Sequence, residues 1–146
     1  MIDFEFEFQY AEEKQPTLQK VGGSIPAGRC VVLCGGSGCG KSTLLRCING
    51  LIPQFYEGEL KGFCRLNGQD TAGIRIGEIG ELAASVFQDP RSQFFTVNSS
   101  NEVAFGLENH GLPQDKIRRR VDDAFRIFHL ERLKDRSVYE LSSGER

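Results

Sequence analysis

The sequence predicts an α/β fold, and three patterns along its 146 residues carry that prediction. Residues 2–10 alternate between apolar and polar side chains, which is typical of a strand with one solvated face. Residues 30–34 are apolar without alternation, as in a strand covered on both faces, and they lead into a glycine-rich loop. From Ser99 onward, apolar residues recur at helical spacing. We therefore expect antiparallel strands first, then a parallel core strand, then helices.

The composition is that of about one soluble globular domain. Hydrophobic residues make up 39% of the chain and charged residues 26%, which excludes wholesale disorder. A net charge of -2 supplies no global basic field, so we expect no nucleic-acid partner. No apolar run approaches the roughly 18 residues of a membrane span, and the acidic start resembles no signal peptide. These features predict a cytoplasmic chain.

Five cysteines without CxxC spacing predict reduced thiols rather than a zinc site. We expect them to be buried or partly buried and to act as small hydrophobic residues. They are Cys30, Cys34, Cys39, Cys47 and Cys64.

In addition to the apolar strand at residues 30–34, the first part of the chain predicts two strands and one helix. Strands are expected at residues 2–10 and 17–21, followed by turns at Gly22, Gly23, Pro26 and Gly28. A helix is expected from Lys41, because Leu44, Leu45 and Ile48 share one face and Gly50 follows as a stop signal.

The rest of the chain predicts two strands and then helices. Residues 63–66 form a short strand before a turn at Asn67 and Gly68, and residues 83–87 form a second apolar strand ending at Gln88. Ser99 and Glu102 have the spacing of a capping box. After Pro113 the predicted apolar stripe comprises Ile117, Val121, Ala124, Phe125 and Phe128. The basic run 116–120 is interpreted as a solvated helix face rather than a nucleic-acid contact.

The loop at residues 35–42 fits the pattern G-x-x-x-x-G-K-[ST] between a strand and a helix, which predicts a phosphate-binding loop. Its glycines let successive N–H groups converge on phosphate oxygens, and the following helix adds its positive end. Lys41 is expected to contact the β and γ phosphates, Ser42 to complete the shell of a Mg²⁺ ion, and Thr43 to bond an inner phosphate. The predicted binding residues are Gly35, Gly36, Ser37, Gly38, Cys39, Gly40, Lys41, Ser42 and Thr43.

This loop names a nucleoside triphosphate but not a reaction. Asp70 and Gly73 imitate the D-x-x-G of a GTPase, but a turn signal precedes them instead of a buried strand, and no N-K-x-D guanine reader follows. We interpret the match as a coincidence.

Three further features make the sequence resemble the ATP-binding subunit of an ABC transporter. Tyr10 stands at the end of an early strand, Gln88 follows an apolar strand, and residues 141–146, Leu-Ser-Ser-Gly-Glu-Arg, look like the LSGGQ signature. The resemblance implies an incomplete P-loop NTPase core of the RecA-like type. Residues 1–97 would form an antiparallel β subdomain and the start of this core, residues 98–141 a helical subdomain, and residues 141–146 the signature.

The resemblance also implies ligands and partners. Tyr10 would stack on the adenine of ATP, and Gln88 would ligate Mg²⁺ and hold a water. Ser142, Ser143, Gly144 and Glu145 would act in trans on ATP held by a second ATPase subunit, in a head-to-tail homo- or heterodimer. Each feature has a simpler interpretation: Tyr10 as a core residue, Gln88 as a polar strand end, and the signature as a capped turn.

The signature departs from the family, since Ser143 replaces a glycine and Glu145 replaces a glutamine. Ser143 adds a Cβ and Glu145 a negative charge near the expected phosphate, which puts affinity at that site in question.

The segment from Gln88 to Phe95 would contact a transmembrane transporter subunit, placing the protein at the cytoplasmic face of the membrane. Residues 86–95 and 101–109 look most like the energy-coupling factor ATPases of vitamin and metal-ion importers. A soluble ABC ATPase of DNA repair or translation shares these motifs and is the alternative.

In this family the Walker B aspartate, the catalytic glutamate and the switch histidine follow the signature. None is found in the 146 residues. We therefore expect transport-coupled ATPase activity in a longer parent protein, and a chain that by itself binds nucleotide without hydrolysing it. We also expect the edge of segment 30–34 to be exposed.

Overall fold

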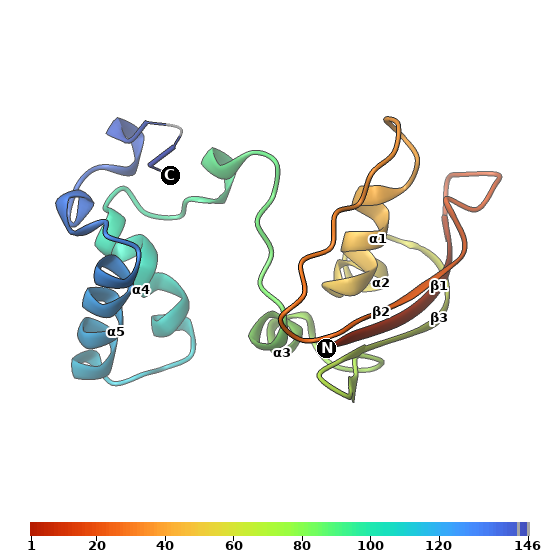
Figure 1. Ribbon diagram of the computed structural model, residues 1–146, viewed down its shortest axis with the longest axis horizontal. Coiled ribbons are helices and arrows are strands. Elements are labelled where there is room, and N and C mark those ends of the chain that lie inside the picture. Colours follow the sequence, from red (N-terminus) through yellow and green to blue (C-terminus); the bar gives the residue numbers. More distant parts are fainter. Residues whose placement is uncertain (143, 146) are drawn as a thin grey trace. The chain divides into compact units, whose positions relative to one another are not determined.

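A computed structural model describes residues 1–142, 144 and 145. The chain divides into two compact units, residues 1–85 and 86–146, and each is described by itself. Figure 1 labels the α-helices of both units and strands β1, β2 and β3. The predicted subdomain boundary after residue 97 stays a prediction. In the described residues, no helix has the length and apolar character required to cross a membrane.

The first unit contains a four-stranded antiparallel sheet, as the sequence predicted. Its strands are β1 (Ile2–Tyr10), β2 (Leu18–Ile25), β3 (Gly58–Leu66) and β4 (Gln69–Asp70), in the order β2-β1-β3-β4. All nine residues of β1 pair with β3, from Ile2 opposite Leu66 to Tyr10 opposite Gly58. β1 is therefore the central strand on which the unit is built.

One face of β1 forms the floor of the core. Phe4, Phe6 and Phe8 are buried, in agreement with the predicted alternation. Helices α1 (Lys41–Ile48) and α2 (Leu51–Gln54) cover this face, and α3 (Ile76–Leu82) adds Ile79 to the same cluster. Burial of these apolar side chains anchors the start of α1, and with it the end of the glycine loop, to the sheet.

Two boundaries in the sheet differ from the prediction. The glycines at 22 and 23 continue β2 instead of turning, because they pair with Glu5 and Phe4 of β1. β3 begins at Gly58, five residues before the predicted start, because its whole length matches β1. Asn67 and Gly68 form the predicted turn, both with positive φ.

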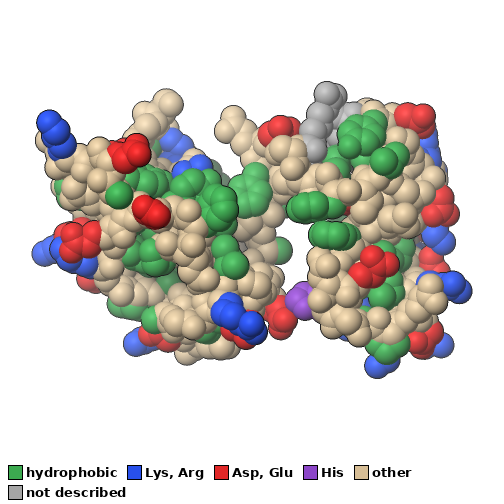
Figure 2. All heavy atoms as spheres, turned by 180° about the vertical axis from the view of Figure 1, so that it is seen from behind, with side chains coloured by type: hydrophobic (Ala, Val, Ile, Leu, Met, Phe, Trp, Pro, Cys, Tyr) green, Lys and Arg blue, Asp and Glu red, His purple; other side chains and the backbone are tan. Residues whose placement is uncertain are grey.

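The sequence predicted a parallel core strand at residues 30–34 and a second apolar strand at residues 83–87, and both predictions are wrong. Neither segment is regular, and Val32 is 77% exposed and Val86 89% exposed. A strand requires a hydrogen-bonding neighbour, and the described residues offer these two segments none. The side chains of residues 30–34 are exposed, but the predicted exposed strand edge is wrong because the segment is not a strand. Figure 2 shows hydrophobic side chains at the surface of both units.

The second unit is helical, as predicted. It contains α4 (Ser99–Asn109) and α5 (Gln114–Ile127) with three short 3-10 turns, η1 (Pro90–Gln93), η2 (Glu131–Leu133) and η3 (Val138–Glu140). The stripe of α5 buries Ile117, Val121 and Phe125. Phe128 was wrongly placed in this stripe: it is 70% exposed because it caps the end of the helix. The basic run 116–120 is exposed except for Ile117.

The predicted capping box at Ser99 is also wrong. Asn98 is the N-cap of α4, and its side chain accepts hydrogen bonds from the N–H groups of Ser100 and Asn101. Glu102 instead accepts from the backbone of Phe95 and Thr96. The carboxylate thereby ties the segment before the helix to the first turn of α4.

The burial of the thiols follows the prediction at two positions only. Cys47 and Cys64 are buried, whereas Cys30, Cys34 and Cys39 are exposed. The three exposed thiols lie in the unpaired segment 30–34 and in the loop after it, where no packing partner covers them. All five are free.

The core on β1 yields a stability prediction. Phe6→Ala is expected to lower the free energy of unfolding by about 3–5 kcal/mol, because it removes a nearly fully buried ring. Phe55→Ala is the matched control, since Phe55 is 73% exposed. Urea denaturation followed by circular dichroism measures both. Equal losses for the two variants would contradict this account of the core.

Candidate nucleotide site

The glycine loop takes a backbone path that requires its glycines. Gly38 and Gly40 have φ of 79° and 90°, the left-handed region that other residues rarely adopt. A Cβ on Gly40 would also lie 3.0 Å from Leu18 and 3.2 Å from the carbonyl oxygen of Thr17. The loop therefore passes close to β2 and turns sharply into α1.

The Lys41 side chain folds back over this loop. Its Nζ donates to the carbonyl oxygens of Gly35 at 2.9 Å and Gly36 at 2.6 Å, and lies 3.5 Å from Sγ of Cys39. The ammonium group thus lies against the backbone of the loop and places a positive charge there. An anion bound there would meet a charge already in place.

The N-terminus of α1 has no partner from a side chain. Its N-cap is Gly40, no side chain caps it, and its first turn contains no acidic residue. Helix N-terminal N–H groups without such partners attract anions, and the helix dipole adds to the attraction. Ser42 in this first turn is exposed, so its hydroxyl is accessible to a ligand.

Tyr10 is connected to this helix. Its hydroxyl lies 3.1 Å from Oγ1 of Thr43 and accepts a hydrogen bond from Arg46 at 3.2 Å. The Arg46 guanidinium also lies 4.3 Å from the centre of the Tyr56 ring. Tyr10 is half-buried, with its ring edge-on to Phe8 at 4.7 Å. The strand end and the glycine loop are therefore held in one arrangement.

A polar cavity of about 460 Å³ lies beside Tyr10. It is lined by Tyr10, Ala11, Glu12, Glu13, Arg46 and Glu57. Because Thr43 contacts the Tyr10 hydroxyl and Arg46 of the same helix lines the cavity, this cavity and the glycine loop are linked through α1. Thr43 itself is buried, and its hydroxyl has Tyr10 as partner.

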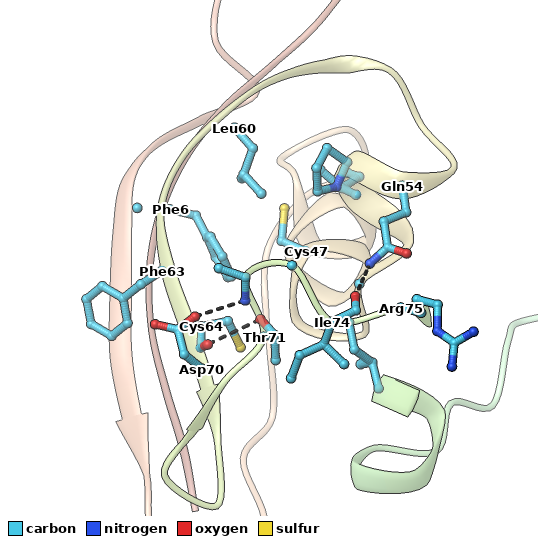
Figure 3. A pocket seen from close by; sticks show the side chains of 17 residues that line it. Phe6, Cys47, Gln54, Leu60, Phe63, Cys64, Asp70, Thr71, Ile74 and Arg75 are labelled. Atoms are coloured by element: carbon cyan, nitrogen blue, oxygen red, sulfur yellow. Dashed lines mark hydrogen bonds between the residues drawn. The ribbon is translucent and has the colours of Figure 1, made fainter. Parts of the chain in front are cut away.

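A second cavity, of about 420 Å³, lies between the sheet and the segment after β4. Figure 3 shows Phe6, Cys47 and Cys64 pointing into it, with Gln54 bonded to the carbonyl oxygen of Ile74 at 2.7 Å. Burial raises the pKa of the Cys47 thiol to about 12. No residue of the predicted phosphate loop lines this cavity, which is mostly apolar.

Gln88 lies in the second unit, exposed, in a segment without regular structure. The turn after it is closed by side chains of its own, since Ser92 and Gln93 both donate to the carbonyl oxygen of Asp89. Phe95, where the predicted contact segment ends, is 76% exposed and stacks on Phe105 at 4.7 Å.

The signature also lies in the second unit, after η3. Leu141 is buried in the helical core, which fixes the start of the motif. The Glu145 carboxylate accepts hydrogen bonds from the N–H of Ser142 at 3.1 Å and from its hydroxyl at 2.7 Å, and pairs with Arg132 at 2.8 Å. These hydrogen bonds, and next the Arg132 guanidinium, hold the pKa of the Glu145 carboxyl below its usual value. Ser143 and Arg146 lie outside the described residues.

A family comparison matches residues 18–146 to the ABC transporter model. The chain belongs to the ABC transporter family. The mixed α/β structure, with an antiparallel sheet, a phosphate loop and a helical part, agrees with a partial ATP-binding P-loop domain of this family.

Similar proteins of this family come from several bacteria. A Treponema denticola protein described as an ABC transporter ATP-binding protein is 43% identical over 95% of this chain, and one from Streptomyces coelicolor is 38% identical over 99%. The chain spans 28% and 26% of the length of these two relatives. It therefore corresponds to about a quarter of each protein.

Two basic residues were not predicted from the sequence: Arg46 in the first unit and Arg132 in the second. Arg46 shares a helix face with Thr43 at i and i+3, so this spacing could have placed it near Tyr10. No sequence pattern indicated Arg132, because it pairs with Glu145 only when η2 and the signature fold side by side. The spacing of Ser142 and Glu145 is that of a capping box, a signal present in the sequence.

Proposed function

We propose that this chain is the nucleotide-binding part of the ATPase subunit of an ABC importer, which couples MgATP binding and hydrolysis to transport. The observation that carries the proposal is the Lys41 ammonium over a left-handed glycine loop at an uncapped helix, in a chain of this family. The description of its relatives as ABC transporter ATP-binding proteins supports ATP as the nucleotide.

The residues present fit MgATP. The loop N–H groups and Lys41 supply donors and positive charge for the phosphates, and the exposed Ser42 hydroxyl supplies an oxygen ligand of the kind that Mg²⁺ prefers. Gln88 would supply a second oxygen ligand through its amide carbonyl. When bound, Mg²⁺ would neutralise charge on the phosphates. Thr43 would contact an inner phosphate with its N–H, while its hydroxyl stays with Tyr10.

Tyr10 would hold the adenine. Its hydroxyl is anchored by Thr43 and Arg46, which fixes the orientation of the ring next to the polar cavity. An aromatic face stacks on a base without reading its hydrogen-bonding edge. The same anchor places the base site at a set spacing from the phosphate loop.

The second unit would face a partner subunit. The signature residues Ser142, Ser143, Gly144 and Glu145 would contact ATP held by another ATPase subunit, in a head-to-tail homo- or heterodimer. The segment from Gln88 to Phe95, with an exposed aromatic ring at its end, would contact a transmembrane subunit at the cytoplasmic face of the membrane. The match of residues 86–95 and 101–109 favours an importer of the energy-coupling factor type.

Hydrolysis is proposed for a longer protein of the relatives' kind, since this chain spans 28% and 26% of the length of the two relatives. The 146 residues supply phosphate, base and Mg²⁺ contacts but no apolar strand ending in Asp-Glu. The chain alone is therefore proposed to bind nucleotide rather than to hydrolyse it. Co-fractionation of the intact protein with membranes distinguishes the transporter from a soluble ABC ATPase of DNA repair or translation.

Removal of the loop cation tests the phosphate site. Lys41→Ala in the intact protein is expected to weaken MgATP binding by about 10- to 100-fold, because charged hydrogen bonds to phosphate are lost. Lys116→Ala is the matched control, since it removes the same charge from the exposed face of α5. Isothermal titration calorimetry measures both. Unchanged affinity in Lys41→Ala would refute the phosphate-loop assignment.

Two substitutions separate the ring of Tyr10 from its hydroxyl. Tyr10→Ala is expected to weaken MgATP binding by about 5- to 100-fold, the range of base stacking on an aromatic ring. Tyr10→Phe keeps the ring and loses only the bonds to Thr43 and Arg46, so a loss of a fewfold at most is expected. Equal losses in the two variants would show that the hydroxyl anchor, and not stacking, carries the effect.

A further inference from the structure

The Glu145 carboxylate accepts hydrogen bonds from both polar hydrogens of Ser142. One oxygen, Oε2, accepts both the backbone N–H at 3.1 Å and the hydroxyl at 2.7 Å. The other, Oε1, lies 2.8 Å from Nη1 of Arg132. Both carboxylate oxygens thus have partners within the second unit, and the Glu145 side chain is only 22% exposed.

Ser142 offers these same hydrogens to the phosphate of a second subunit under the proposed function. A hydroxyl has one hydrogen and donates to one acceptor at a time. Phosphate contact through the Ser142 hydroxyl therefore requires that the carboxylate leave. A carboxylate that stayed in place would also repel the phosphate, because both groups are negatively charged and would lie close together.

Arg132 holds the carboxylate in that position. It belongs to η2, whose next residue, Leu133, is 1% exposed in the helical core, so the backbone of Arg132 is fixed. An exposed ion pair contributes little by itself. Here the Arg132 guanidinium pairs with Oε1, the carboxylate oxygen that Ser142 does not contact. Glu145 must therefore break three contacts to move away.

We propose that Glu145 is an internal competitor for the signature site. Its carboxylate occupies the anion-binding donors of Ser142, Arg132 fixes it there, and the nucleotide held by the second subunit must displace it. This inference rests on the proposed function, which assigns Ser142 to that nucleotide. The signature usually has glutamine where this chain has Glu145. With Glu145, Ser142 would contact the nucleotide of the second subunit only at a higher MgATP concentration than with glutamine.

The chemistry of the amide explains why glutamine would behave differently. A neutral amide oxygen accepts hydrogen bonds more weakly than a carboxylate, does not pair with a guanidinium as an ion, and does not repel a phosphate. Glu145→Gln keeps the size and shape of the side chain. It therefore lowers the competition without removing the side chain that caps Ser142.

The test is MgATP binding by the intact protein, measured by isothermal titration calorimetry. Glu145→Gln is expected to bind about three- to tenfold more tightly than the unaltered protein. Glu131→Gln is the matched control, since it removes one exposed negative charge beside Arg132 and leaves the Ser142 contacts intact. Its affinity is expected to stay unchanged.

A gain in affinity is a readout that structural damage does not produce, and thermal unfolding of each variant confirms that it is folded. Unchanged or weaker binding in Glu145→Gln overturns the inference, as does an equal gain in Glu131→Gln. If Lys41→Ala still weakens binding by about 10- to 100-fold in that case, the proposed function stands and only the competitor role fails. If Lys41→Ala binds normally, the proposed function itself fails.

Discussion

The packing of α1 on the buried face of β1 is the interaction on which the proposed nucleotide site depends. Phe4, Phe6 and Phe8 present one apolar surface because strand side chains alternate, and Leu44 and Cys47 of α1 lie against it. This contact fixes the helix N-terminus relative to the sheet. The same strand ends at Tyr10, whose hydroxyl reaches Thr43 on that helix. One strand register therefore sets both the phosphate loop and the proposed base site.

Residues 30–34 and 83–87, in contrast, have no strand partner among the described residues. Most of their side chains are apolar, yet most lie exposed, since backbone hydrogen bonding in a strand needs a neighbour that the described residues do not supply. The prediction was wrong about their structure because composition indicates which surroundings a segment prefers. It does not indicate whether a partner strand is present. The loop keeps its turn into α1 because Gly40, β2 and α1 determine it locally.

The parts of the fold that sequence predicted are those with short-range causes. The alternation of β1, the Asn67–Gly68 turn and the stripe of α5 each follow from a repeat or a turn residue read directly from the chain. The errors have two kinds of cause. Asn98 caps α4 in place of Ser99 because its side chain accepts hydrogen bonds from the N–H groups of Ser100 and Asn101, two and three residues along the chain. The glycines of β2 became strand because β1 paired with them.

At the site, the sequence pattern named the loop residues, and the structure added their partners. Lys41 over the loop carbonyls follows from its place in the motif, whereas Arg46 on Tyr10 and Arg132 on Glu145 depend on folding of distant segments. The central claim is that the glycine loop binds the phosphates of MgATP through its backbone. Hydrogen–deuterium exchange of the intact protein, with and without MgATP, tests it directly. The account predicts slower exchange of the amides at residues 36–43 when MgATP is present, and unchanged exchange there at saturating MgATP would contradict it.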